Sequence, residues 1–438
     1  MLPLILVRLT KFLFVPTIGS VLAITTHAQN NGTDKYLAYQ QSLDLLNQKE
    51  YFRLKDELNL LKSSLDNYQR LFFQAYVDNA FNNNRRSIEE VDTLLKYDFS
   101  KLTDSVRARL YLLQDDSYFK LFQYSKAAHC DSVLLNKYST VLDSAQVEDM
   151  KNKLIMRNGL AGISAQQTII RSNTILKWKK DELGLIEVPI HRNSNTYDAI
   201  FDTRANISCI SQTYAAKLNL NVLPVSYNEG SGITGIQFKA GIGVADSVYL
   251  GGILVRNAVF LVLPDSTLQV TPDFAINIII GFPVIEQLHE IHIYKDGRMI
   301  IPLKTLSSPL HNLALDGLDP IVSVKSETDT LVFHFDLGAN QTVLYYDYFV
   351  KYNSSILKNG IKKSTEYGGA GGVQKKDVFT IPSLVLFLND KKITLDSIDV
   401  LTQRIYPKEK FYGNLGQDFI RDFNELILNF KEMYIRAR

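Results

Sequence analysis

The chain has 438 residues, a length that predicts two or three domains rather than one hydrophobic core. Hydrophobic residues make up 46% and charged residues 21%, which is typical of a globular protein. The formal net charge is +2, so the charge balance gives no reason to expect nucleic acid as a partner.

Residues 1–28 have the pattern of a secretory signal peptide. Arg8 and Lys11 form a positive start, residues 12–24 are mostly apolar, and residues 26–28 suit a signal peptidase. The apolar stretch is too short for a comfortable membrane span of about 20 residues, with an uncleaved anchor as the alternative. No second apolar run of spanning length follows. We therefore expect an exported protein, periplasmic or extracellular, with no membrane span after signal removal.

Residues 29–172 predict an all-α domain. The segment contains no proline, which favours a long helical array. Phe81 with Leu94, and Phe122 with Leu134, indicate a helix-pair unit of roughly 40 residues. This unit resembles a tetratricopeptide repeat, with a plain helical bundle as the alternative. Apolar residues recur at three- and four-residue steps: Leu43, Leu46, Phe52, Leu54, Leu58, Leu61 and Leu65.

From about residue 173 the apolar period changes to two, which predicts β-strands. Many short strands at even spacing predict one closed or nearly closed β lobe in residues 173–310 and another in residues 311–438. Residues 383–388 are expected to correspond to residues 258–263 or to the strand just before them. The predicted fold is therefore multidomain, with a helical domain followed by an all-β bilobal region.

One motif occurs twice in the β-rich region, and internal repeats are informative about architecture. In each copy an apolar strand ends on an aspartate, Asp202 or Asp336, and a tight turn that contains Ala-Asn follows. A Gly-rich segment comes next, and then an apolar run ends on Gly281 or Gly416. The spacing from the aspartate to this glycine is nearly the same in the two copies. Three landmarks in one order at matching spacing indicate a repeated unit.

These turns and Gly-rich segments resemble those of the retropepsin and pepsin aspartic proteases, over about residues 185–438. The resemblance implies two lobes that each supply one catalytic aspartate, Asp202 and Asp336. It implies supporting roles for the residues that follow each aspartate: Thr203, Arg204, Ala205, Leu337, Gly338 and Ala339. It also implies substrate-binding flaps in the Gly-rich segments, with plain hairpin turns as the alternative: Gly230, Gly232, Gly368, Gly369 and Gly371.

The resemblance implies an endopeptidase that attacks a peptide bond with water and forms no covalent intermediate. Two close carboxylates cannot both ionise easily, so they share one proton. The ionised carboxylate is the base for the water, and the protonated one donates to the carbonyl oxygen. A peptide or protein substrate would lie extended between the lobes. No cofactor is implied and no Cys-His spacing indicates a metal; we expect Cys130 and Cys209 to be buried thiols rather than a disulfide.

Two positions depart from the family pattern. Arg204 stands where the family has Gly, and Leu337 stands where it usually has Thr or Ser. A guanidinium close to the aspartates would favour loss of the shared proton. Leu337 removes a hydroxyl that ties the two turns together, so Thr203 needs another partner. The alternative function is therefore a silenced pseudoprotease that binds extended peptides or partner proteins, and a third hypothesis gives the function to the helical domain.

Overall fold

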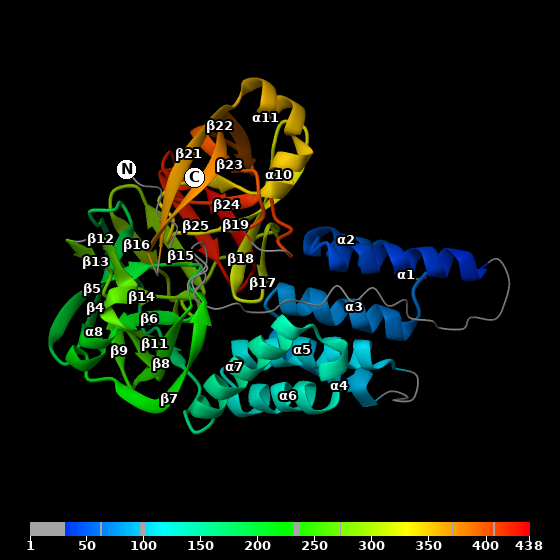
Figure 1. The fold of residues 1–438 in the computed structure, drawn as a ribbon, viewed down its shortest axis with the longest axis horizontal. Coiled ribbons are helices and arrows are strands. Elements are labelled where there is room, and N and C mark those ends of the chain that lie inside the picture. The colour runs from blue at the N-terminus through cyan, green and yellow to red at the C-terminus, as the bar shows by residue number, and fades with distance from the viewer. Residues whose placement is uncertain are drawn as a thin grey trace. The chain divides into compact units, whose positions relative to one another are not determined.

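The computed structural model describes residues 31–438 except 62–63, 97–101, 231–236, 272, 370–371 and 406–407. The predicted signal peptide, residues 1–28, lies outside the described residues. The described chain divides into two compact units (Figure 1). Residues 31–165 with Ala314–Gly317 form a helical unit, and Gln166–Leu313 with Leu318–Arg438 form a β-rich unit. The predicted order, a helical region followed by a β-rich region, is confirmed.

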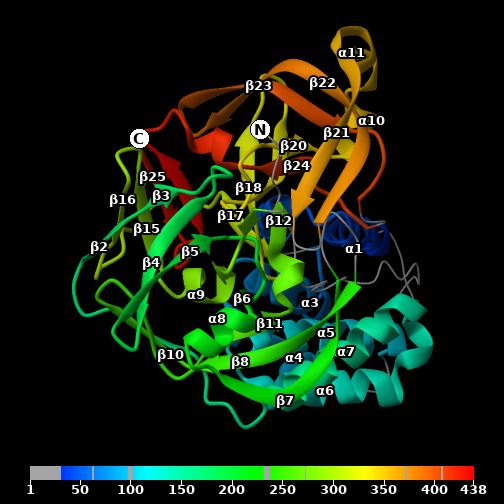
Figure 2. The same ribbon diagram turned by 60° about the vertical axis from the view of Figure 1, so that its left-hand side comes forward.

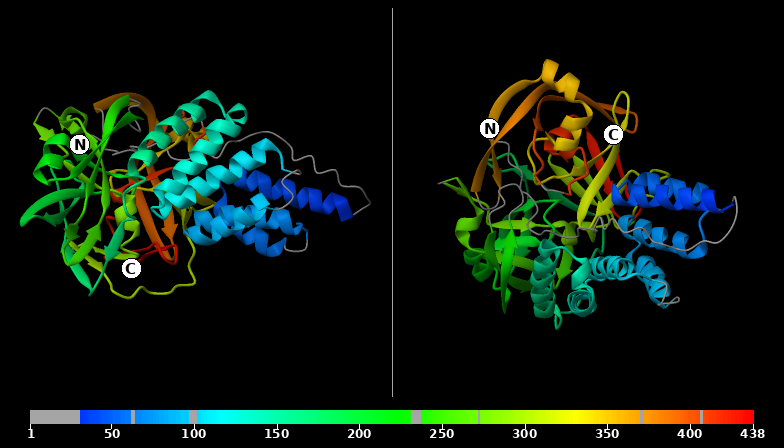
Figure 3. Two further views of the ribbon diagram at one scale, coloured as in Figure 1. Left: turned by 90° about the horizontal axis from the view of Figure 1, so that it is seen from below. Right: turned by 45° about the vertical axis from the view of Figure 1, so that its right-hand side comes forward.

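Consecutive helices of the helical unit pack side by side (Figure 3). The helices are α1 (Asn31–Asn47), α2 (Tyr51–Leu60), α3 (Asn67–Ala80), α4 (Asn84–Lys96), α5 (Asp104–Lys120), α6 (Tyr124–Lys137) and α7 (Ser144–Leu160). Tight turns join α1 to α2, α3 to α4 and α5 to α6. Each contains a residue with positive φ: Lys49 at 59°, Asn82 at 63° and Phe122 at 57°. Ala127 on α6 is fully buried, which lets neighbouring helices approach closely.

A buried ionic cluster joins three helices of this unit. The Arg157 guanidinium of α7 forms an ion pair with Asp115 of α5, at 2.7 Å, and a second with Asp131 of α6. All three side chains are fully buried. Burial raises the pKa of Asp115 and of Asp131, while the Arg157 charge opposes that rise. The predicted tetratricopeptide-like character of these helices stays a prediction.

The β-rich unit is built from many short strands, as the period-two pattern predicts. Alternating exposure along β4 (Ile186–Arg192) marks a strand with one buried face, whereas β14 (Ile278–Ile280) is buried on both faces. The other strands before residue 310 are β1 (Gln167–Ile169), β2 (Thr174–Lys177), β3 (Lys179–Lys180), β5 (Asn195–Phe201), β6 (Ser208–Ser211), β7 (Asn221–Gly230), β8 (Gln237–Ala245), β9 (Val248–Leu250), β10 (Ile253–Arg256), β11 (Ala258–Leu263), β12 (Gln269–Thr271), β13 (Phe274–Ala275), β15 (Glu290–Tyr294) and β16 (Arg298–Ile301).

The remaining strands belong to the second half of the region, with short helices between them. The strands are β17 (Leu313–Asp316), β18 (Asp319–Lys325), β19 (Thr330–Phe335), β20 (Val343–Leu344), β21 (Ile361–Gly369), β22 (Gly372–Leu388), β23 (Lys391–Leu401), β24 (Gly413–Leu415), β25 (Glu425–Asn429) and β26 (Tyr434–Ala437). The helices of the β-rich unit are α8 (Gln212–Lys217), α9 (Phe282–Glu286), α10 (Tyr346–Lys351) and α11 (Asn353–Asn359).

Two sheets of this unit have the same strand order, and Figure 2 shows strands of both. One sheet contains the path β4-β5-β14-β6-β11-β8-β7, and the other contains β18-β19-β24-β20-β23-β22-β21. Neighbouring strands at equivalent places in the two paths have the same relative direction, parallel or antiparallel. For example, β5 is parallel to β14, and β19 is parallel to β24. The two sequence repeats thus fold with one topology.

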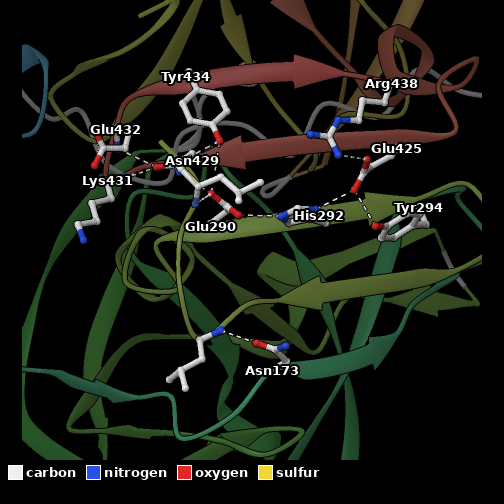
Figure 4. Close-up of polar contacts among 12 residues, drawn as sticks. Asn173, Glu290, His292, Tyr294, Glu425, Asn429, Lys431, Glu432, Tyr434 and Arg438 are labelled. Atoms are coloured by element: carbon white, nitrogen blue, oxygen red, sulfur yellow. Dashed lines mark hydrogen bonds and ion pairs between the residues drawn. The ribbon is translucent and has the colours of Figure 1, made fainter. Parts of the chain in front are cut away.

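A third sheet joins β2, which precedes the first repeat, to strands that follow each repeat, in the order β2-β16-β15-β25-β26. Its centre holds a polar cluster around His292 (Figure 4). The His292 ring contacts Glu290 at 2.8 Å on its own strand and Glu425 at 2.7 Å on β25. The second carboxylate oxygen of Glu290 accepts the side-chain amide of Asn429 at 2.6 Å. This cluster ties β15 to β25 through side chains as well as through the backbone.

Other sequence predictions can be compared with the described residues. Cys130 and Cys209 are free, buried thiols, as predicted. Within the described residues, none of the helices combines the length and the apolar composition needed to span a membrane. The predicted domain boundaries at residues 172 and 310 stay predictions.

Candidate active site

The two predicted aspartates occupy equivalent places at the carboxyl ends of parallel strands. Asp202 follows β5, and its N–H donates to the carbonyl of Ile280 at 3.0 Å. Asp336 follows β19, and its N–H donates to the carbonyl of Leu415, also at 3.0 Å. Each aspartate is therefore fixed by the adjacent parallel strand, and both side chains are buried, at 1% and 0% exposure.

The turns after these strands are held by Gly281 and Gly416 in the same way. The N–H of Gly281 donates to the hydroxyl of Ser208 at 3.0 Å, and that of Gly416 donates to the hydroxyl of Thr342 at 3.1 Å. A Cβ at Gly281 would lie 2.5 Å from the carbonyl oxygen of Ala205. A Cβ at Gly416 would lie 2.6 Å from the backbone after Asp336. Only glycine lets each Asp turn pack so closely on its neighbouring strand.

Gly338 lies between the two carboxyl groups. Its N–H donates to Asp336 Oδ1 at 2.9 Å. A Cβ at Gly338 would lie 2.3 Å from Asp202 Cγ and 2.5 Å from both carboxylate oxygens of Asp202. One glycine thus touches both aspartates, and the two Asp turns face one another across it. This juxtaposition is what the repeated motif predicts.

The two turns are also linked through Thr203. Its buried hydroxyl donates to the carbonyl of Phe335 at 3.0 Å and accepts the N–H of Leu337 at 2.9 Å. Leu337 has no hydroxyl with which to form the reciprocal pair of bonds. The link between the turns is therefore one-sided, and Thr203 finds its partners in the opposite backbone.

Residues 187–284 match the aspartyl protease family model. This aspartyl protease segment begins in β4, contains Asp202 with its turn, and ends in α9, just after Gly281. Asp336 lies outside the matched residues. No curated protein matches the chain. The comparison thus shows a likeness to aspartyl proteases over residues 187–284.

The aspartate of the aspartyl protease segment is held by backbone donors on one oxygen. Asp202 Oδ1 accepts the N–H of Arg204 at 2.7 Å and that of Ala205 at 3.1 Å. Burial raises the pKa of Asp202 well above its ordinary value, and the nearby charge of Asp336 raises it further. The two N–H bonds oppose this rise but do not cancel it. Asp202 therefore tends to keep a proton.

Asp336 has donors on both oxygens. Gly338 donates to Oδ1, and the side-chain amide of Asn414 donates to Oδ2 at 2.9 Å. Burial raises the pKa of Asp336 to about 6, and the Arg204 charge and the Asn414 hydrogen bond limit that rise. The two carboxyl groups thus differ in their tendency to ionise, which is the condition for acid and base roles in one pair.

The Arg204 side chain leaves the aspartyl protease segment and enters the second repeat. Its guanidinium donates through Nη1 to the Tyr345 hydroxyl at 3.2 Å and to Asn414 Oδ1 at 3.0 Å. Its Nη2 lies 3.8 Å from a carboxylate oxygen of the buried Asp319. Arg204 thus forms an ion pair with Asp319, whereas the silenced alternative requires its guanidinium to act on the two aspartates. Residues of the second repeat surround the long Arg204 side chain and accommodate it.

Sequence reasoning missed the residues that receive Arg204. Asn414 stands on β24 at the position that Ile279 holds on β14. A polar residue on a short strand that is otherwise buried was the available signal. His334 on β19 is also buried, and its Nε2 lies 3.3 Å from Glu409. Among the described residues, no group of His, Cys, Asp and Glu is arranged to hold a metal ion.

The Gly-rich segments lie at the ends of paired strands. Gly230 ends β7, which pairs with β8, and Gly368 and Gly369 end β21, which pairs with β22. Gly232 and Gly371 lie outside the described residues. Gly230, Gly368 and Gly369 therefore lie at the ends of equivalent strand pairs in the two repeats, and the role of the Gly-rich segments as flaps stays a prediction.

Proposed function

We propose that this protein is an aspartic endopeptidase that hydrolyses peptide bonds with Asp202 and Asp336. The observation that carries the proposal is the contact of Gly338 with both carboxyl groups. Two buried carboxyl groups on facing turns hold one proton between them, because the second ionisation brings two like charges together. The aspartyl protease match over residues 187–284 supports the same reading.

The reaction follows from the two protonation states. The ionised carboxylate removes a proton from a water molecule as that water attacks the peptide carbonyl. The protonated carboxyl donates its proton to the carbonyl oxygen. As the C–N bond breaks, the carboxyl that took the proton of the water passes it to the leaving nitrogen, and the other carboxylate takes back a hydroxyl proton, which gives a carboxylic acid and an amine. Hydrogen bonds from backbone N–H groups hold both carboxyl groups in place during these steps.

We further propose that the two repeats are tandem retropepsin-like lobes and that substrate lies extended between them. The identical strand orders support the lobes. The hairpins β7/β8 and β21/β22 would act as flaps and pair with substrate by strand-like hydrogen bonds. Because Asp202 and Asp336 are almost fully buried in this structure, substrate entry requires the residues that cover them to move.

The position of Arg204 bears on the silenced alternative. Silencing requires a cation that removes the shared proton. Arg204 lowers the pKa of both aspartates, yet the pKa of Asp202 stays well above its ordinary value and that of Asp336 is about 6. Asp319 shares the guanidinium and so weakens its effect on the dyad. These observations support an active pair over a silenced one.

Cleavage of a disordered protein by the purified chain, from about pH 3 to pH 8, tests the activity. We expect turnover in the wild type and its loss in Asp202→Ala and in Asp336→Ala. Asp422→Ala is the matched control, because its side chain is 57% exposed in the same unit. Equal turnover in all four proteins, or none in the wild type, would reject the proposal.

We also propose that the chain is exported and that its helical unit contacts a partner protein. The composition of residues 1–28 supports export. Fractionation of expressing cells, with N-terminal sequencing of the product, tests this. A product that starts at residue 29 outside the cytoplasm supports export, whereas a cytoplasmic product that retains Met1 contradicts it. Crosslinking of the exported protein through its helical unit tests for the partner.

A further inference from the structure

We propose that Arg204 is a positioning residue that acts through Asn414, and that this relay makes Asp336 the base and Asp202 the acid of the pair. The inference rests on the proposed peptidase function, but it concerns where one proton sits and can be tested without substrate. It gives Arg204 a function at a position where the sequence departs from the family pattern.

The direction of each hydrogen bond in the relay is fixed by chemistry. A guanidinium only donates, so the Asn414 atom 3.0 Å from Arg204 Nη1 must be the amide oxygen. The amide nitrogen of Asn414 therefore faces Asp336, and it donates to Oδ2 at 2.9 Å. Oδ1 of Asp336 already accepts the N–H of Gly338 at 2.9 Å. Both oxygens of Asp336 are thus held as acceptors, which is the arrangement of an ionised carboxylate.

Asp202 has the opposite arrangement. Its two backbone donors, Arg204 and Ala205, both point at Oδ1. In the part of the chain that the structure describes, Oδ2 of Asp202 receives no hydrogen-bond donor. A proton on Oδ2 therefore meets no competing N–H and can be donated. The shared proton belongs on Asp202 Oδ2 before reaction.

The relay occurs in only one of the two repeats. The residue equivalent to Arg204 in the second turn is Gly338, and the residue equivalent to Asn414 on β14 is Ile279. Neither can send a donor to Asp202. The chain thus makes two otherwise equivalent carboxyl groups unequal by a pair of residues that only one side contains.

The other charged groups around Asp336 agree with this assignment. The Arg204 charge lowers the pKa of Asp336 and the Asp319 charge raises it, which leaves that pKa at about 6. Burial and the Asp336 charge raise the pKa of Asp202 well above its ordinary value. His334, with Glu409 at 3.3 Å, lies behind the relay, and burial and the Arg204 charge lower the pKa of His334. A neutral His334 adds no cation to compete with Arg204.

Two isosteric variants test the proton position without any substrate. Asn can replace a protonated Asp by donating from its amide, so Asp202→Asn should melt at nearly the wild-type temperature near pH 7. Asp336→Asn must turn an NH₂ group toward Gly338 or Asn414, both donors, so it should melt roughly 4 °C or more below Asp202→Asn. Asn414→Leu removes one of these donors and should shrink the difference. Equal melting temperatures, or Asp202→Asn the lower, would overturn the assignment.

The pH profile of kcat/KM tests the relay in the working enzyme. Asn414→Leu and Arg204→Met should each move the acidic limb up by about one pH unit or more, because the base loses its donor or the charge behind it. Asn414→Gln and Arg204→Lys, which keep a donor, should move it less. If the wild type cleaves and the pH profiles of all four variants coincide with the wild-type profile, the proposed relay is wrong. If it does not cleave but the melting differences appear, the proposed function fails while the proton assignment stands.

Discussion

Thr203 and Leu337 occupy equivalent positions after the two aspartates, and the hydroxyl of Thr203 accepts the buried N–H of Leu337 at 2.9 Å. The same hydroxyl donates to the carbonyl of Phe335 at 3.0 Å. Since Leu337 has no hydroxyl to offer in return, the Thr203 side chain alone supplies this pair of bonds.

Replacing Thr203 with Val should therefore destabilise the β-rich unit. The change leaves a buried N–H and a buried carbonyl without a partner, at a cost of roughly 1–3 kcal/mol. Turnover should fall at least tenfold, because the two carboxyl groups lose their alignment. Thr203→Ser keeps the hydroxyl and is the control. Denaturant unfolding and kcat/KM measure both effects, and a Val variant that behaves like the Ser variant would contradict the link.

Gly338→Ala should abolish turnover. The added Cβ would lie 2.3 Å from Asp202 Cγ, so the two turns must separate. Overpacking of this kind destabilises by about 1–3 kcal/mol. Gly241→Ala is the matched control in the same unit, because the nearest atoms to its Cβ would be at 3.7 Å, an ordinary contact. Activity retained in Gly338→Ala would show that the carboxyl groups do not meet across this glycine.

The cluster around His292 should give the β-rich unit a pH-dependent stability. Burial lowers the pKa of His292, but hydrogen bonds to Glu290 and Glu425 outweigh burial and raise it above 6.5. Its contribution is therefore full below pH 6.5 and is lost as pH rises through the raised pKa. The pKa of Glu290 is lowered, since the bonds to His292 and Leu306 outweigh burial, so its contribution is lost as pH falls below 4.5.

Stability from this cluster should thus be greatest between about pH 4.5 and pH 6.5. His292→Gln should lose roughly 1–3 kcal/mol in that window and less at pH 9. Melting temperatures of the wild type and the variant across this range give the difference directly. If the difference in melting temperature grows toward alkaline pH, the stabilising role of a charged His292 is wrong.

Arg157→Met should strongly destabilise the helical unit at neutral pH. It leaves Asp115 and Asp131 buried without their cation, a loss of about 3–5 kcal/mol. Without Arg157 the pKa of each carboxyl rises further, so protonation relieves the penalty and the loss should be smaller near pH 4.5. Lys151→Met removes an exposed ion pair on the same helix and should change stability by less than about 1 kcal/mol. Helical circular dichroism during urea unfolding measures both variants.

The sequence repeat was sufficient to predict that Asp202 and Asp336 end equivalent strands and face one another. It left the match of one strand open between two alternatives. Residues 383–388 were expected to correspond to residues 258–263, or to the strand just before them. By strand order, the first part of β22 corresponds to β8. Residues 383–388, at the end of β22, pair with β18 and with the start of β23 as β9 pairs with β4 and β10, so they correspond to β9, the second of the two expected matches. The polar alternation of β23 gave no apolar run by which to recognise it.

The destination of Arg204 could not be predicted for a different reason. Its partners Asn414, Tyr345 and Asp319 are each single polar residues on or beside apolar strands, and the nearest of them along the chain is more than a hundred positions away. Local pattern and periodicity carry no information about such a pairing. These side chains meet because the folded chain places the two Asp turns face to face.

The one-sided relay and the one-sided Thr203 link make the two repeats depend on each other. A symmetric dimer of the first repeat would bury two Arg204 guanidinium groups opposite two copies of Ile279, with no amide to receive either. A symmetric dimer of the second repeat would have Leu337 on both sides and no hydroxyl to bridge them. Neither repeat supplies both partners by itself, so each Asp turn depends on groups of the other repeat.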